Sequence, residues 1–491
     1  MPEPRDVEQS ALMDVDPATA GVPQRKRPVD KTFRRYDQDQ PMLLAPDVRD
    51  WLPAGDPARW VDDLVDHGLD LAPFYDDYTE ARGAPPYDPR LMLKLLIYGY
   101  SNGITSSREL ERRCQHDVAF MFLTAQAAPD FVAISRFRRR HLLAFMELFT
   151  QVLGLCAQAG LVSLGRVALD GSKIRASASR HRAMSYDRMV RAEGELAAEV
   201  KQLLADAERT DTAEDATYGQ RRGDELPAEL RRRENRLTVI RKAKADLETQ
   251  HAAKARAKAE QAAAERGAAE SEQAAAGDEA EAAAVVPAKA QRSFTDPDAR
   301  IMKTSDGSFH YCYNAQTVVD EHSQVILSTT LVPSGADSPQ LPAALTDLAE
   351  GLQAAGIEGT PQTLLADAGY FSQDNVKAVT EAGIDPLIAT GRHKHGEKPP
   401  AAPRGRIPKG LTPKQLMTRK LRTKKGAADY ARRKAIVEPA FGQMKVAQDA
   451  GRLRLRGLDN AQGEWTLQAL CHNARKLRNS GFHWIPAPAL S

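Results

Sequence analysis

Three acidic residues stand where carboxylates could act together in catalysis. Asp170 follows the apolar run 167–169, Asp367 ends a second run in TLLAD, and Glu438 lies in the later segment YARRKAIVEPAFGQMK. Neighbouring strands that end on carboxylates can bring two oxygen ligands together, and a helix packed across the sheet can add a third. Mg²⁺ and Mn²⁺ prefer oxygen ligands. Two such ions about 3.5–4 Å apart can activate a water or a sugar hydroxyl and stabilise the leaving oxygen of a phosphodiester.

Each of these residues also has a structural interpretation. Asp is a poor strand former, so Asp367 could be a turn residue or a helix cap before SQDN. Asp170 alone could be a turn residue before Gly171, and Glu438 alone could be a solvated charge on a helix. The choice depends on the elements around them.

The elements around the three acids alternate between strand and helix. After the strand at 167–169, the runs FHYCYNAQTVVD and SQVILSTTLVP predict a hairpin. A helix near 338–355, the strand TLLAD, a helix over about 373–382 capped by Ser372, the strand DPLIAT and a long helix from about 427 follow. This order predicts an α/β fold around a mixed sheet. Pro439 should kink or begin the last helix directly after Glu438.

The segment before the sheet, 41–160, is predicted to be a helical domain. Pro89 suits the first turn of a helix, Ser106 and Glu109 form a candidate capping box, and a further helix should begin near Asp130. Short helices that end in RFRRRH resemble a DNA-binding domain of the helix-turn-helix type, although a small helical bundle explains the pattern almost as well. Residues 1–40 are polar and contain proline, which predicts a disordered tail.

A long helical insertion should separate the first strand from the hairpin. Residues 186–250 carry apolar positions at helical spacing, among them Leu196, Leu237 and Ile240, and predict an antiparallel helical hairpin. Residues 251–290 form an Ala-rich low-complexity tract that should be a mobile tail without a core of its own. The fold tolerates such an insertion only if its ends, near 186 and 290, lie close together. The sheet domain is then 161–185 and 291–480.

Overall composition excludes several classes of protein. The chain contains 68 Lys and Arg and 66 Asp and Glu, so its net charge of +2 does not indicate the kind of binding partner. The four cysteines are scattered, the N-terminus is acidic and no run of about 18 apolar residues occurs, which together predict a cytoplasmic protein without a membrane segment. Basic runs such as RFRRRH and TRKLRTKK, the latter over 418–425, make a polyanionic partner plausible.

Several motifs together resemble a known family. ALDGSKIRASAS, ADAGYFSQDN and IVEPAFGQMK are similar to the three acidic motifs of DDE transposases from bacterial insertion sequences. PPYDPRLMLKLLIYGYSNGITSSRELER and PDFVAISRFRRRH are similar to the N-terminal domain common in that group. The resemblance covers roughly 40–180 and 293–478, and it implies an RNase H-like catalytic domain.

The resemblance also implies a reaction and a set of site residues. Asp170, Asp367 and Glu438 match the catalytic, metal-binding triad, which holds Mg²⁺ or Mn²⁺, expected as two ions. The implied reaction is cleavage of DNA at insertion-sequence ends and transfer of the 3′-hydroxyl into target DNA, on double-stranded DNA, by a homodimer in the nucleoid-associated cytoplasm. A nuclease without strand transfer and an inactive DNA-binding relic remain alternatives. The expected DNA contacts are Lys445, Tyr430, Arg433 and Lys434 of the third motif and Arg136, Arg138, Arg139 and Arg140.

Overall fold

The computed structural model describes residues 47–79, 85–178, 183–218, 228–391 and 402–483. The predicted disordered tail, 1–40, lies outside these residues. The chain divides into two compact units, 1–47 and 48–491, and the elements described below belong to the second. Among the described residues no single helix is long and apolar enough to cross a membrane. In this part of the chain, the helices Phe131–Arg140 and Leu142–Gln158 reach that length and composition only when taken together, and they are bent by 75°.

The first part of this unit is helical, as expected. Asp88 caps α4 through the N–H of Arg90 with Pro89 in the first turn, and Asp130 caps α7. The predicted capping box is wrong: in the described chain Ser106 makes no capping bond with its side chain, and Glu109 pairs with arginines of its own helix. The elements are α1 (Val48–Trp51), α2 (Pro57–Asp63), the π-helical η1 (Leu64–Gly68), α3 (Ala72–Asp76), α4 (Pro89–Ser101), α5 (Ser107–His116), α6 (Val118–Leu123), α7 (Phe131–Arg140) and α8 (Leu142–Gln158).

The second part is built on a six-stranded mixed sheet, which confirms the predicted α/β fold. The strand order is β4-β5-β1-β7-β8, with β6 also paired to β5. β1 runs antiparallel to β5 and parallel to β7, and β8 continues the parallel side. The strands are β1 (Arg166–Arg175), β4 (Arg300–Lys303), β5 (Phe309–Asp320), β6 (Ile326–Val332), β7 (Thr363–Ala366) and β8 (Asp385–Ile388).

Strand β1 is longer than the predicted 167–169. Its pairing with β5 runs from Val167 to Arg175, whereas its pairing with β7 stops at Leu169. Asp170 therefore lies inside a strand that has a partner on one edge only at that point. An aspartate is tolerated there because the second edge is open beyond the end of β7.

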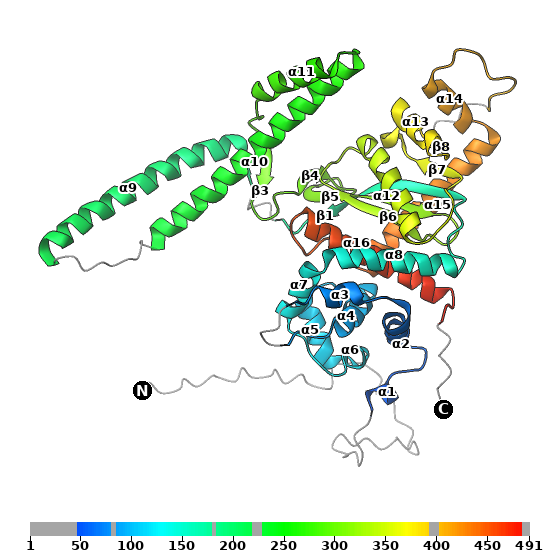
Figure 1. The fold of residues 1–491 in the computed structure, drawn as a ribbon, viewed down its shortest axis with the longest axis horizontal. Helices are drawn as coiled ribbons and strands as arrows, with labels where there is room; N and C mark the ends of the chain where they lie inside the picture. Colours follow the sequence, from blue (N-terminus) through cyan, green and yellow to red (C-terminus); the bar gives the residue numbers. More distant parts are fainter. Residues whose placement is uncertain (1–46, 80–84, 179–182, 219–227, 392–401, 484–491) are drawn as a thin grey trace, which may run out of the picture. The chain divides into compact units, whose positions relative to one another are not determined.

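Helices cover the sheet and join it to the helical part. Helix α15 packs on β1, β5 and β7, while α12 and α16 pack on β6, and α16 also lies against α8 and α4 (Figure 1). One continuous core contains side chains from both parts, with Trp465, Tyr100 and Tyr313 fully buried. The remaining elements are η3 (Ser338–Gln340), α12 (Leu341–Ala354), η4 (Ala368–Tyr370), α13 (Gln373–Glu381), α14 (Pro413–Leu421), α15 (Lys424–Ala447) and α16 (Leu458–Asn479).

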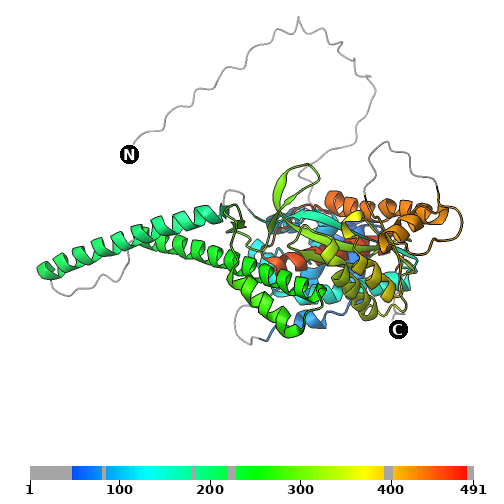
Figure 2. The same cartoon turned by 90° about the horizontal axis from the view of Figure 1, so that it is seen from above.

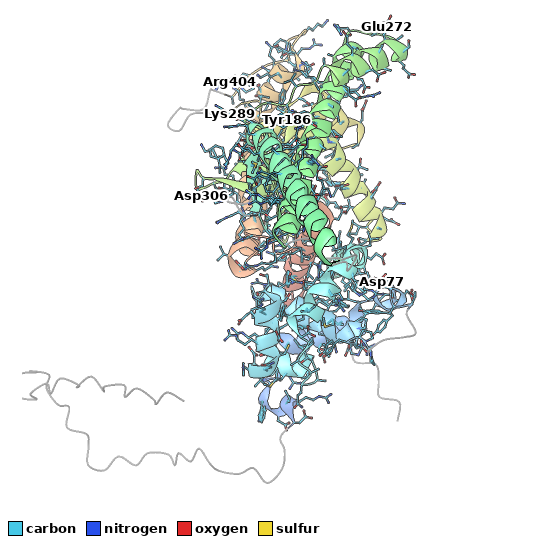
Figure 3. The ribbon with its side chains drawn as sticks, turned by 90° about the vertical axis from the view of Figure 1, so that its left-hand side faces the viewer. Asp77, Tyr186, Glu272, Lys289, Asp306 and Arg404 are labelled. Atoms are coloured by element: carbon cyan, nitrogen blue, oxygen red, sulfur yellow. The ribbon has the colours of Figure 1, made fainter. Side chains whose placement is uncertain are left out.

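The predicted insertion, 186–290, contains α9 (Tyr186–Tyr218), α10 (Ala228–Glu265) and α11 (Glu270–Ala282), and it is flanked by the strands β2 (Ala183–Ser185) and β3 (Gln291–Ser293). Helices α9 and α10 run side by side (Figure 2) around a small core of their own, which includes Leu196, Leu237 and Ile240. The N–H of Tyr186 donates to the carbonyl of Ala290 at 2.8 Å. Figure 3 accordingly places the labels of Tyr186 and Lys289 next to each other. The two ends of the insertion meet, as expected.

The Ala-rich tract is more regular than predicted. It completes α10, turns at Gly267 and returns as α11, which packs along α10. Arg256 of α10 forms ion pairs with Asp278 and Glu281 of α11, and Gly277 lets α11 approach the side chain of Glu260. Small side chains cannot build a broad core, but they allow two helices to pack closely, so this tract is a helical hairpin and not a mobile tail.

Candidate active site

Asp170 lies in β1, and Asp367 directly follows the neighbouring strand β7. Leu169 of β1 pairs with Ala366 of β7 in parallel register, and the next residue of each chain segment is an aspartate. The main-chain N–H of Gly369 donates to the Asp367 carboxylate at 2.8 Å, so Asp367 also caps the short helix η4. The structural and the chemical interpretation of Asp367 are thus compatible.

The electrostatic surroundings of Asp170 favour a cation. Burial raises the pKa of the Asp170 carboxyl, and the charge of Asp367 raises it further. Arg433 of α15 acts in the opposite direction, with its Nη1 at 3.1 Å from the Asp170 carboxylate. Two partly buried carboxylates that repel each other are stabilised by positive charge between them. The pair therefore fits a hard divalent cation, although Arg433 is the cation that contacts it here.

Glu438 lies on the helix that crosses this face of β1, but it does not join the pair. Helix α15 is anchored by Arg433 at Asp170 and by Lys445, whose Nζ donates to the Ser172 hydroxyl at 2.6 Å. Within the described chain, Glu438 is exposed between these anchors and has no hydrogen bond or ion pair to either aspartate. Among the described residues, no three His, Cys, Asp or Glu side chains are grouped closely enough to hold a metal ion.

The side chains expected to contact DNA from α15 have different surroundings. Arg433 is half-buried against Asp170, and Tyr430 is hydrogen-bonded to Arg433. Lys445 is held by Ser172, and burial lowers the pKa of its ammonium group. Lys434, by contrast, is exposed. In this state three of the four stabilise the site itself, and Lys434 faces solvent.

The arginines at the end of α7 also include both exposed side chains and side chains that are bound within the protein. Arg136 and Arg139 are exposed, and Arg140 donates to the Asp77 carbonyl and lies over the Tyr78 ring. Arg138, which was also expected to contact DNA, is only 4% exposed. Its guanidinium donates to the Tyr100 hydroxyl at 2.6 Å, to the Thr105 carbonyl at 2.9 Å and to the Ser107 hydroxyl.

Sequence reasoning missed Asp337, which lies beside the segments of both Asp170 and Asp367. Its Oδ1 accepts hydrogen bonds from Asn314 at 2.7 Å and from Gln316 at 3.1 Å. A Cβ on Gly171 would stand 2.6 Å from the Asp337 Oδ1, and a Cβ on Gly369 would stand 3.3 Å from its Oδ2. The glycines that follow the two aspartates therefore make room for a third carboxylate. That pair of glycines is the signal by which a close approach could have been suspected.

Tyr370 ends the short helix η4 that follows Asp367. It is fully buried, and its hydroxyl donates to the Gln316 side chain. Burial raises the pKa of the phenol, and the negative charges of Asp337, Asp170 and Asp367 raise it further. The phenol therefore stays neutral, which agrees with a packing role.

A basic segment extends from the site along α14 and the first half of α15. Residues 404–434, here called the basic stretch, contain 12 Lys or Arg and one acid, Asp429, which pairs with Arg166 at 2.9 Å. Such a concentration stands out in a chain whose net charge is +2. Figure 3 labels Arg404 at its beginning. The exposed members are Arg404, Arg406, Lys409, Lys414, Lys424, Lys425, Arg432 and Lys434.

Comparison with protein families matches two segments of the chain. Residues 46–140 match a transposase domain, DUF772, and residues 286–474 match the transposase DDE domain. Asp367 and Glu438 lie in the second segment, whereas Asp170 precedes it because the insertion separates β1 from the rest of the sheet. Searches of the curated proteins and of the solved structures find no match. The two matched segments make up more than half of the chain, and with the RNase H-like arrangement of the sheet they establish that it belongs to the DDE transposases of insertion sequences.

Proposed function

We propose that this transposase cleaves DNA at the ends of its insertion sequence in a metal-dependent reaction and joins the 3′-hydroxyl to target DNA. The observation that carries the proposal is the parallel register that sets Asp170 beside Asp367, with α15 anchored across them. Asp170 and Asp367 would hold the metal, and Glu438 would complete the ligand set. When bound, divalent cations activate the attacking oxygen and stabilise the leaving oxygen of the phosphodiester.

The chain's own residues prepare this site. Arg433 opposes the rise that burial causes in the pKa of the Asp170 carboxyl and so favours its ionised form, which is the form that binds a metal. Lys445 holds α15 at Ser172, one side chain further along the same face of β1. Gly369 donates its N–H to Asp367 and so orients that carboxylate. Asp170 and Asp367 are thus held by direct contacts, whereas the position of Glu438 depends on the course of helix α15.

Each chemical step is an in-line exchange at phosphorus. In cleavage, a water oxygen forms a bond to phosphorus as the bond to the 3′-oxygen breaks, and that oxygen takes up a proton. In transfer, the 3′-hydroxyl attacks a target phosphodiester in the same way and loses its proton. No covalent link to protein is required.

The substrate and assembly belong to the same proposal. Double-stranded DNA with inverted-repeat ends is the substrate, and the exposed basic stretch supplies charge for its phosphates. Two ends require two protomers, so a homodimer is the expected active complex. The place of action is the nucleoid-associated cytoplasm.

Single-turnover cleavage tests the assignment of the three acids. Asp170→Asn, Asp367→Asn and Glu438→Gln each remove a charged ligand and nearly keep its shape, so cleavage of a duplex bearing the flanking DNA of the gene should fall at least about 10³-fold in Mg²⁺ or Mn²⁺. End binding, measured by fluorescence anisotropy, should stay within about two-fold. Asp374→Asn, an exposed aspartate on α13, is the control.

The products separate the alternatives. Joined target DNA identifies a transposase that transfers strands, cleaved ends without joining identify a nuclease, and binding without cleavage identifies an inactive relic. A near wild-type rate for any of the three variants removes that residue from catalysis.

A further inference from the structure

Pro439 leaves a gap in the hydrogen bonding of α15 beside the proposed ligand Glu438. In a regular helix the carbonyl of Ala435 accepts from the N–H of the residue four positions later. That residue is Pro439, which has no N–H and whose ring presses on the same carbonyl. The sequence predicted a kink or a helix start here, yet α15 continues through the proline from Lys424 to Ala447. Something outside the helix has to satisfy the carbonyl.

The side chain of Gln324 fills this gap. Its Nε2 donates to the Ala435 carbonyl at 3.1 Å. Its Oε1 accepts from the Lys476 ammonium group at 3.0 Å. An ammonium group can only donate and a carbonyl can only accept, so the chemistry of the two partners fixes which end of the amide faces which.

The main chain of Gln324 is held in an unusual conformation. Its φ is +59°, a left-handed value that side-chain-bearing residues adopt at a cost. Its carbonyl accepts from Nε2 of His472 at 2.8 Å, and the imidazole is buried and neutral, because burial lowers its pKa to about 4. A strained residue that is held at both ends, with its amide aimed at a foreign helix, points to a positioning role.

The same turn secures α15 through a second residue. Glu321 lies in the turn between β5 and β6 and pairs with Arg432 of α15 at 2.7 Å and with Arg166 of β1 at 2.5 Å. The turn therefore contacts α15 at two successive places on the side of the helix that precedes Glu438. Gln324 contacts the helix at the Ala435 carbonyl, where the internal hydrogen bond is missing. This contact bears on the direction of the following helical segment, which carries Glu438.

We propose that Gln324 is a positioning residue that replaces the hydrogen bond missing at Pro439 and thereby sets the approach of Glu438 to Asp170 and Asp367. This proposal rests on the proposed function, which gives Glu438 its role as a ligand. Without the Gln324 amide, α15 is free to bend at the proline. The third carboxylate then reaches the pair less often.

A double-mutant cycle tests the proposal. Gln324→Met keeps the length of the side chain and removes the donor. Pro439→Ala supplies an N–H to the Ala435 carbonyl from within the helix, so Gln324 should become dispensable. With Pro439 present, Gln324→Met should raise the Mn²⁺ concentration for half-maximal cleavage about five-fold, as expected for one hydrogen bond. In the Pro439→Ala background the same change should have less than about a two-fold effect.

Thermal unfolding provides the second readout. Gln324→Met should lower Tm more in the chain that keeps Pro439 than in the Pro439→Ala background, where only the contact with Lys476 is lost. His322→Leu, a change at an exposed residue of the same turn, controls for disturbance of the turn and should change neither quantity. End binding should be equal in all variants.

The outcomes are distinct. Equal effects of Gln324→Met in both backgrounds would overturn the idea that it acts through the gap. Coupling in Tm without any shift in Mn²⁺ dependence would reduce Gln324 to a structural role and also overturn the proposal. If Glu438→Gln cleaves normally, the proposed function fails instead, while the Tm cycle still reports the hydrogen bond.

Discussion

Two arginine- and lysine-rich regions look alike in sequence and differ in structure. The run at the end of α7 places one arginine, Arg138, in the core. In the basic stretch the buried positions of α14 and α15 are taken by Met417 and Gly426. Arg138 in the first region therefore supports packing between helices, whereas the exposed lysines of the second region, such as Lys414, Lys424 and Lys425, remain available to a polyanion.

The difference follows from helical spacing and from the available partners. Arg138 comes four residues after the buried Ile134 and so falls on the inward face of α7. It is tolerated there because Tyr100 binds it and because Glu464, buried on α16, adds a negative charge nearby. A basic run in a sequence thus shows which segment is charged, but the position of each residue around the helix decides whether its side chain is exposed to solvent.

The largest expected effect comes from removing the buried arginine. Arg138→Met removes the cation with the largest effect on the buried Glu464, so the free energy of unfolding in urea should fall by about 4 kcal/mol, as for other broken buried charge networks. The exposed pair Arg136→Gln/Arg139→Gln should change it by less than about 0.5 kcal/mol. Adding Glu464→Gln to Arg138→Met should recover part of the loss. Equal destabilisation by the buried and the exposed changes would erase the contrast between them.

A second buried group of α16 makes stability depend on pH. Burial lowers the pKa of His472 from 6.5 to about 4. The imidazole therefore binds a proton more tightly in the unfolded chain than in the folded one. The contribution of neutral His472 to the free energy of unfolding is complete above about pH 6.5 and is lost as the pH falls towards 4, by up to about 3 kcal/mol. His472→Gln should remove the contribution. Urea unfolding at pH 7 and pH 4.5 should therefore show a difference in the free energy of unfolding between wild type and variant that is smaller at the lower pH. An equal difference at both pH values would contradict a lowered pKa of His472.

The smallest expected effect on stability, and the clearest on DNA, belongs to the basic stretch. Changing four of its exposed lysines to Gln should weaken end binding about ten-fold and reduce the slope of log K against log salt by about 0.9 for each phosphate that is no longer bound. Unfolding should be unaffected. The variant carries Lys414→Gln, Lys424→Gln, Lys425→Gln and Lys434→Gln, and the charge-matched control on the insertion carries Lys242→Gln, Lys254→Gln, Lys258→Gln and Lys289→Gln. Equal weakening by both sets would show a general charge effect and no local surface.

Much of the fold was predictable because strong local patterns agreed. The β5–β6 hairpin, the Ser372 cap, the Asp130 cap and the buried Trp465 follow from alternation, capping chemistry and helical spacing. The parallel register of β1 and β7 could be expected from two apolar runs that each precede an aspartate. The convergence of the two aspartates is the part of the site that periodicity can anticipate.

The other parts of the site depend on contacts between distant segments. Gln324 lies 111 positions before the Ala435 carbonyl that it satisfies, and nothing in its local sequence marks it. Asp337 precedes a short helix and looks like a cap until Gly171 and Gly369 are seen beside it. The burial of Arg138 depends on Tyr100, which belongs to another helix. Such pairings become visible only when the chain is folded.

The hydrogen bond between Tyr186 and Ala290 has a consequence for how this protein can change over evolutionary time. The chain leaves and re-enters the sheet domain at two points that are joined by this hydrogen bond and by the antiparallel pair of β2 and β3, and neither family match extends over most of what lies between. Loops closed in this way can be lengthened, shortened or exchanged at small cost. The insertion that contains α9, α10 and α11 can therefore be replaced as a unit. A fluorescent domain can be inserted at the same junction without disturbing the register that sets Asp170 beside Asp367.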